Sequence, residues 1–74
     1  MNKQAMSFQI CDRNYTAELT DQFRYAGRQC DRYEVRVIND DGDREFFGTV
    51  ECPRRATVAQ RRDQIASEIG IRAD

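Results

Sequence analysis

The chain has 74 residues, of which 39% are apolar and 34% are charged, and its formal net charge is −1. This length allows one small core, and the composition excludes a disordered chain, which would combine low hydrophobicity with high net charge. The sequence lacks a stretch apolar enough to span a membrane and an apolar signal-peptide segment near its start. We therefore expect one cytoplasmic domain over residues 7–71, with a flexible tail at 1–6 and a short tail at 72–74.

The first apolar residues alternate with period two, as in a strand that buries one face. Phe8 and Ile10 share one face, and the alternation resumes over residues 15–19 after a polar break. If Arg13 and Asn14 form a two-residue loop, both apolar sets fall on the same face. The pattern predicts a first β-hairpin.

Residues 20–32 leave two interpretations open. Thr20 could cap a short helix that ends near Gly27, or Phe23 and Tyr25 could continue a strand that breaks at this glycine. The balance favours an irregular connection with one helical turn.

A second hairpin is indicated by alternation over residues 33–38, followed by an acidic turn and a second apolar segment. Asp41-Gly42 is typical of a type I′ turn, which needs positive φ angles. This turn would pair Val37 with Phe46, Val35 with Gly48, and Tyr33 with Val50. It would also place Arg36, Ile38 and Phe47 on the outer face, where an apolar pair often marks an interface.

The C-terminal segment predicts a helix over 58–69. Thr57 and Gln60 have the spacing of a capping box, and Gly70 suits the C′ position beyond the last turn. Four apolar side chains share one helical face: Val58, Ile65, Ala66 and Ile69. The order of elements predicts an α+β domain, with a small antiparallel sheet of about four strands in two hairpins and the C-terminal helix packed on one face.

The sequence offers little for chemistry. It contains no histidine, and Cys11, Cys30 and Cys52 are spaced too widely for an ordinary zinc site or a disulfide framework. The acidic turn at 40–45 lacks the ligand spacing of a calcium loop, and no glycine-rich phosphate loop is present. We expect buried free thiols, no metal or cofactor, and no enzymatic activity.

Four arginines gather where the second hairpin meets the helix: Arg54, Arg55, Arg61 and Arg62. Positive charge at a helix N-terminus opposes the helix dipole, so stability alone does not favour this arrangement. The cluster fits a docking patch for an acidic protein surface or a phosphate backbone. The alternative is a solvated face that pairs with Asp63 or Glu51.

Two resemblances bear on function. The second hairpin and helix, residues 33–69, loosely resemble the sheet and last helix of a double-stranded-RNA-binding domain, in which Arg61 and Arg62 would stand for basic residues that grip phosphates. That family opens with a helix, whereas this chain opens with strand signals. In length, charge and element order, the chain resembles small phage-encoded inhibitors, including anti-CRISPR proteins, which act by occupying a partner's functional surface.

The leading hypothesis is therefore a non-catalytic protein-binding module, an inhibitor or regulator from a phage or mobile element. Its candidate contact residues are the arginine cluster and the outer-face residues: Arg54, Arg55, Arg61, Arg62, Arg36, Ile38 and Phe47. A homodimer through the outer face would be a competing use of those residues. The alternative function is weak nucleic-acid binding by the arginine cluster.

Overall fold

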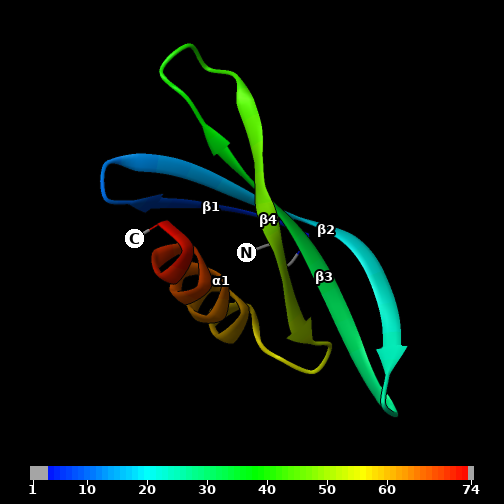
Figure 1. The fold of residues 1–74 in the computed structure, drawn as a ribbon. Helices are drawn as coiled ribbons and strands as arrows, with labels where there is room; N and C mark the ends of the chain where they lie inside the picture. Colours follow the sequence, from blue (N-terminus) through cyan, green and yellow to red (C-terminus); the bar gives the residue numbers. More distant parts are fainter. Residues whose placement is uncertain (1–3, 74) are drawn as a thin grey trace.

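The computed structural model describes residues 4–73, which form four strands followed by one helix (Figure 1). The elements are β1 (Ala5–Ile10), β2 (Arg13–Tyr25), β3 (Arg28–Ile38), β4 (Arg44–Pro53) and α1 (Val58–Ala73). All neighbouring strands pair antiparallel, in the order β1-β2-β3-β4. The predicted α+β class and four-stranded antiparallel sheet are confirmed.

The first hairpin forms, but its predicted loop was wrong by two residues. Cys11 and Asp12 make the turn with φ angles of 52° and 65°, and Phe8 pairs with Tyr15. Because this register differs from the predicted one by an even number of residues, the same apolar side chains still share a face. β1 also starts earlier than predicted, so the last two residues of the predicted tail at 1–6 belong to this strand and Met6 is buried. Residues 1–3 of that tail and Asp74 lie outside the described residues.

The helical turn predicted within residues 20–32 was wrong, and the strand interpretation is confirmed. β2 continues to Tyr25 after an irregularity between Leu19 and Asp21, and Ala26-Gly27 forms a tight turn into β3. Both turn residues have positive φ, at 50° and 77°. β1 pairs with β2 only as far as Glu18, so β2 and β3 extend beyond it as a hairpin.

The second hairpin keeps the predicted register near its base and loses it at a bulge. Tyr33 pairs with Val50 and Val35 with Gly48 as predicted, but Arg36 then pairs with Phe46. Phe47 becomes the extra residue of β4, and such an insertion reverses which side chains face inward.

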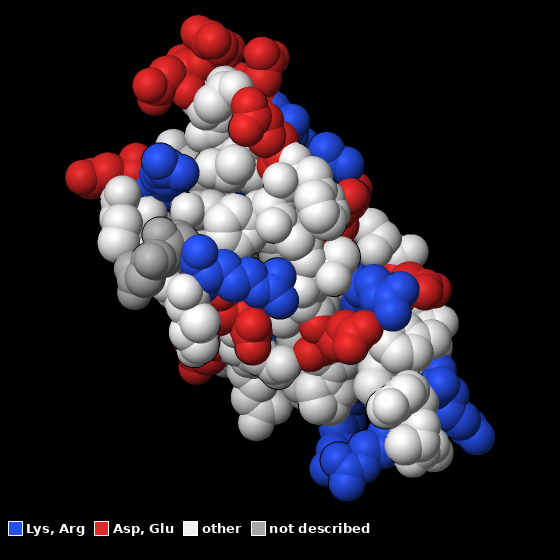
Figure 2. All heavy atoms as spheres, viewed as in Figure 1, with Lys and Arg blue, Asp and Glu red and all other residues white. Residues whose placement is uncertain are grey.

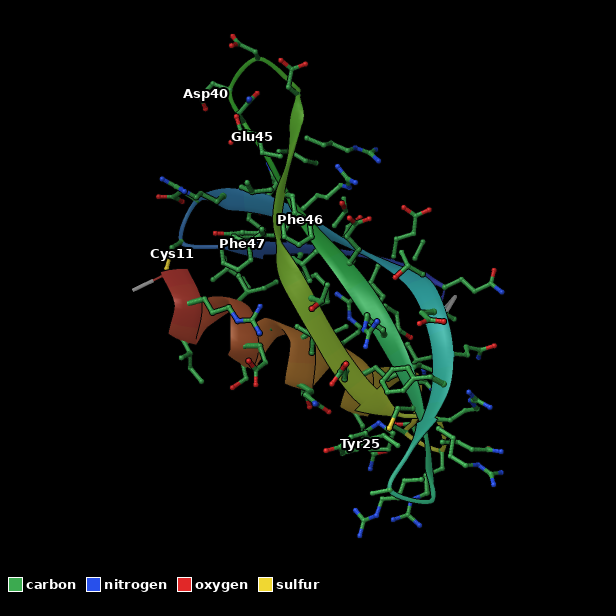
Figure 3. The ribbon with its side chains drawn as sticks, turned by 45° about the vertical axis from the view of Figure 1, so that its right-hand side comes forward. Cys11, Tyr25, Asp40, Glu45, Phe46 and Phe47 are labelled. Atoms are coloured by element: carbon green, nitrogen blue, oxygen red, sulfur yellow. The ribbon has the colours of Figure 1, made fainter. Side chains whose placement is uncertain are left out.

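The bulge corrects the predicted orientation of the two phenylalanines (Figure 3). Phe47 packs on the core, with its ring centroid 5.3 Å from that of Tyr15 in an edge-to-face arrangement. Phe46 is 60% exposed. The sequence prediction had placed Phe46 inside and Phe47 outside, because a strict alternation without a bulge was assumed.

The loop between β3 and β4 is longer than the predicted two-residue type I′ turn. Gly42 has the expected positive φ of 85°, but Asp41 does not. The side-chain oxygen of Asn39 accepts hydrogen bonds from the backbone N–H groups of Asp41 and Asp43, at 3.0 and 2.9 Å. An asparagine side chain thus organises the loop from its first residue.

The helix begins as predicted and ends later. Thr57 and Gln60 form the capping box, with reciprocal bonds of 2.9 and 3.1 Å between the backbone N–H of each and the side chain of the other. Gly70 is an internal helical residue without positive φ, so its predicted C′ role was wrong. The last turn continues because Arg72 is a good helix former, suits the negative end of the dipole, and pairs with Glu68 at 3.6 Å.

One buried cluster holds side chains from every element. Its members are Met6, Phe8, Tyr15, Ala17, Tyr33, Val35, Val50, Cys52, Ile65 and Ile69. The helix contacts the two edge strands, β1 and β4 (Figure 1). Arg62 donates to the backbone oxygen of Ser7 on β1 at 3.1 Å, and Gln64 donates to that of Glu51 on β4 at 2.7 Å. The helix therefore satisfies one carbonyl on each of these strands.

The two glycines Gly42 and Gly70 should respond oppositely to alanine. Gly42→Ala should lower the free energy of unfolding by about 1–2 kcal/mol, because a Cβ is strained at a φ of 85°. Gly70→Ala should raise it by about 0.5–1 kcal/mol, because Gly70 is helical and a Cβ there meets open space. Urea denaturation measures both. A stabilising Gly42→Ala would contradict the loop geometry.

Candidate functional site

The arginine cluster predicted from the sequence contains a buried structural residue. Arg61 is 1% exposed, and its Nη1 atom donates to Asp31 Oδ2 at 2.6 Å and to the Tyr33 hydroxyl at 3.0 Å. Its Nε atom donates to the backbone oxygen of Ala56 at 2.9 Å, and its Nη2 atom to that of Arg54. A guanidinium enclosed in this way offers no exposed surface to a partner, unlike the solvent-facing position that the sequence prediction for Arg61 assumed.

Asp31 is the fully buried acceptor at the centre of this network. Besides Arg61, it accepts from Arg54 Nε at 3.0 Å and from Gln22 Nε2 at 3.2 Å. Burial alone would raise the pKa of Asp31, but the bonds from these three side chains and the charge of Arg61 outweigh it and leave the pKa lowered. Burial likewise opposes the charge of Arg61, and its bonds to Asp31 and Tyr33 raise its pKa above the usual value.

The rest of the predicted cluster does not form one patch. Arg54 is tied to Asp31 and half-buried. Arg62 lies over the ring of Phe8, with 4.8 Å from its guanidinium carbon to the ring centroid. Arg55 is exposed and forms no ion pair with another described residue. Of the four arginines, Arg55 alone keeps the full exposure that the docking prediction required.

The predicted outer-face group is also divided. Arg36 pairs with Glu34 at 3.2 Å, Ile38 is half-buried at the end of β3, and Phe47 faces the core. These three residues therefore do not make a common apolar surface.

A different group of side chains comes together where β2 and β4 end and β3 begins. Phe23 pairs with Cys30, and Cys30 pairs with Pro53, so the three residues form a row across adjacent strands. Tyr25, two pairs further along the hairpin, is 73% exposed (Figure 3). We call this row with Tyr25 the hairpin end.

Arginines surround the hairpin end. Arg24, Arg28 and Arg55 are exposed and form no ion pair with another described residue. Arg28 and Arg55 line a groove of about 580 Å³ that also includes Cys30 and Pro53. Figure 2 shows basic side chains gathered at this end of the molecule and acidic ones at the other.

On its other side, the hairpin end borders a charge network. The guanidinium of Arg32 lies 4.7 Å from the ring centroid of Phe23 and pairs with Asp21 at 3.5 Å and Glu51 at 2.9 Å. An apolar centre with a polar, arginine-rich rim is the usual anatomy of a protein–protein interface.

Sequence reasoning missed the hairpin end because the strand at 20–25 was not assigned. The signal was present in the alternation of Phe23 and Tyr25 with arginines around Gly27. The pairing with Pro53 across three strands needed the register, which the sequence does not supply.

The cysteines differ in exposure, and the expectation of buried free thiols fits Cys52 but not Cys11. Cys11 is exposed in the first turn, Cys30 is half-buried, and Cys52 is buried, which raises its pKa. Within residues 4–73, no group of three or more acidic or cysteine side chains is placed to hold a metal ion. Nor does this part of the chain contain a helix that is long and apolar enough to cross a membrane.

Comparison with known proteins gives no match to a family model, a curated protein or a solved structure.

Arg61 should be far more important for stability than Arg55. Arg61→Ala should lower the free energy of unfolding by about 3–5 kcal/mol, because it leaves Asp31 buried without its main partner. Arg55→Ala should change it by less than about 0.5 kcal/mol, because this side chain is exposed. Thermal and urea unfolding of both variants measure the difference. Equal effects would contradict a structural role for Arg61.

The stability should also depend on the protonation of Asp31. Because its folded pKa lies below the unfolded value of about 3.9, its contribution is complete above that value and is lost as the pH falls through the folded pKa. The difference in unfolding free energy between wild type and Asp31→Asn should therefore shrink as the pH falls from 6 towards 2. Asp63→Asn, at an exposed helical position, serves as the control. A difference that stays constant over this range would contradict the assignment.

Proposed function

We propose that the protein is a non-catalytic protein-binding module that places its hairpin end against an acidic surface of a partner protein. It would act as an inhibitor or regulator by covering that surface. The observation that carries the proposal is the apolar row of Phe23, Cys30 and Pro53 beside exposed Tyr25, with arginines around it. Tyrosine and arginine are the residue types that dominate binding energy at protein interfaces.

The hairpin end is directed away from the helix in this proposal. Asp31 reaches Arg61 on α1, and neighbouring side chains on a strand point to opposite faces. Cys30 and Arg32 therefore project from the face opposite Asp31. We infer that the helix covers one face of the sheet and leaves the other open to a partner.

Charge favours an acidic partner. Three arginines at this end lack ion pairs with other described residues, so a carboxylate-bearing surface would gain charge-assisted bonds without breaking existing ones. Such complementarity raises the association rate and selects against basic surfaces.

Nucleic-acid binding is the second candidate, supported by the shape of the β2–β3 hairpin. A two-stranded ribbon can enter the major groove of DNA, and this one carries Arg24 and Arg28 near its turn. The net charge of −1 and the engagement of Arg54 and Arg61 within the fold favour the protein partner instead.

Site-specific photo-crosslinking tests the proposed surface. A crosslinker at Tyr25 should capture one protein partner in a nuclease-treated extract, whereas a crosslinker at Ile71 should not capture it. With that partner purified, Tyr25→Ala should weaken binding by about tenfold or more, as expected for an anchor residue. Ile71 is 71% exposed on the helix, and Ile71→Ala should leave binding unchanged.

The affinity for nucleic acid, measured at low and moderate salt, separates the two candidate functions. Duplex DNA, duplex RNA and single strands should bind no more tightly than about 10⁻⁴–10⁻⁶ M, the range of nonspecific contacts. Submicromolar binding to any of them between about 50 and 200 mM salt, lost in Arg24→Glu/Arg28→Glu, would replace the protein-binding proposal with the nucleic-acid one.

A further inference from the structure

Opposite charges occupy the two ends of β4. Four acidic side chains lie at its beginning, three in the preceding loop and one at the second position of the strand. We call them the acidic loop: Asp40, Asp41, Asp43 and Glu45. All four are exposed, and Arg44 is the only basic residue among them. Beyond the other end of the strand lie Arg54 and Arg55, with Arg28 across the same groove. Figure 2 shows acidic and basic side chains gathered at opposite ends of the molecule, and Figure 3 labels Asp40 and Glu45 at the acidic end.

β4 is also an edge strand, paired on one side with β3. The outward N–H and C=O groups of an edge can pair with another strand. The centre of β4, residues 46–50, carries no charged side chain, and Phe46 is 60% exposed. The bond from Gln64 to the Glu51 carbonyl and the bulge at Phe47 limit how far a backbone ladder could extend. Side-chain and charge contacts must therefore supply much of any association along this edge.

We propose that two copies of the chain associate along β4 in an antiparallel, two-fold arrangement. Reversing one strand against the other brings the acidic loop of each copy next to Arg28 and Arg55 of the second copy. The symmetry makes this contact twice, and the exposed Phe46 side chains are covered along the shared edge. A parallel alignment would instead place acidic loop against acidic loop and arginine against arginine, so the charges select the antiparallel one.

The two-fold arrangement is closed, because each copy uses the same surface for its partner. The dimer can be tested separately from the proposed function, since self-association is measured with this chain alone. The dimer and an acidic partner would compete for Arg28 and Arg55, because both use these two side chains.

Charge exchange provides the test. Wild type at about 50 mM salt, where the Debye length exceeds 10 Å, should have twice the 8.7 kDa mass of the chain by light scattering. The variant Asp40→Lys/Asp41→Lys should be monomeric, because its lysines would face the arginines of the second copy. The variant Arg28→Glu/Arg55→Glu should also be monomeric, because its glutamates would face the acidic loop of the second copy. An equimolar mixture of the two variants should return to the dimer mass, because both contacts then pair opposite charges.

Three results would overturn the proposal: a monomeric wild type, a mixture that stays monomeric, or open assemblies larger than a dimer. A second measurement locates the interface. In a Cys11→Ser/Cys30→Ser background, Thr49→Cys near the middle of β4 should form an intermolecular disulfide under mild oxidation. Ser7→Cys on β1, at the opposite edge, is the matched control and should not form one; cross-linking there instead of at Thr49 would place the contact on the wrong edge.

Discussion

Asp31 and Arg61 meet through a 2.6 Å bond in the interior of a 74-residue chain, where each charge would be costly without the other. Their bonds join β3, the segment between β4 and the helix, and the first turn of the helix. The Tyr33 hydroxyl accepts a further bond from Arg61, and Arg54 donates a further bond to the Asp31 carboxylate. This network therefore fixes where the chain turns from sheet to helix, and the apolar packing of Ile65 and Ile69 follows from that position.

The same network determines which arginines remain available at the surface. A guanidinium can be a buried structural donor because it offers five donor groups in a rigid plane, and Arg61 uses them on four acceptors. Arg55 lies three residues before the helix, has no such acceptors and stays exposed. In a linear sequence these two residues look alike. The difference lies in Asp31, which is 30 positions away from Arg61.

Local chemistry made much of the fold predictable. The Thr57 capping box and the positive φ of Gly42 depend on short-range signals, and both are present. The predicted pairing of Tyr33 with Val50 is also present, because the longer loop and the bulge at Phe47 offset each other. The failures involve choices that neighbours in space make. Cys11 and Ala26 adopt left-handed turns that their residue types disfavour, because the flanking strands hold them there.

The candidate site was less predictable than the fold because it depends on register. One extra residue at Phe47 exchanged the faces of two aromatic side chains. The row of Phe23, Cys30 and Pro53 joins residues 30 positions apart, and its members have no common motif in the sequence. The arginines could be counted in advance, but which of them bond to buried acceptors could not be predicted.

The bonds from Arg62 to Ser7 and from Gln64 to Glu51 give the helix a second role, because they satisfy one carbonyl on each edge strand of the sheet. Detachment of this one element would release a carbonyl on β1 and another on β4 in the same event, while the strands could remain paired with one another. A partly opened molecule of this kind would expose unpaired groups on both edge strands, together with the core side chains that Ile65 and Ile69 contact. The docking of the helix therefore protects both edge strands and the core at the same time.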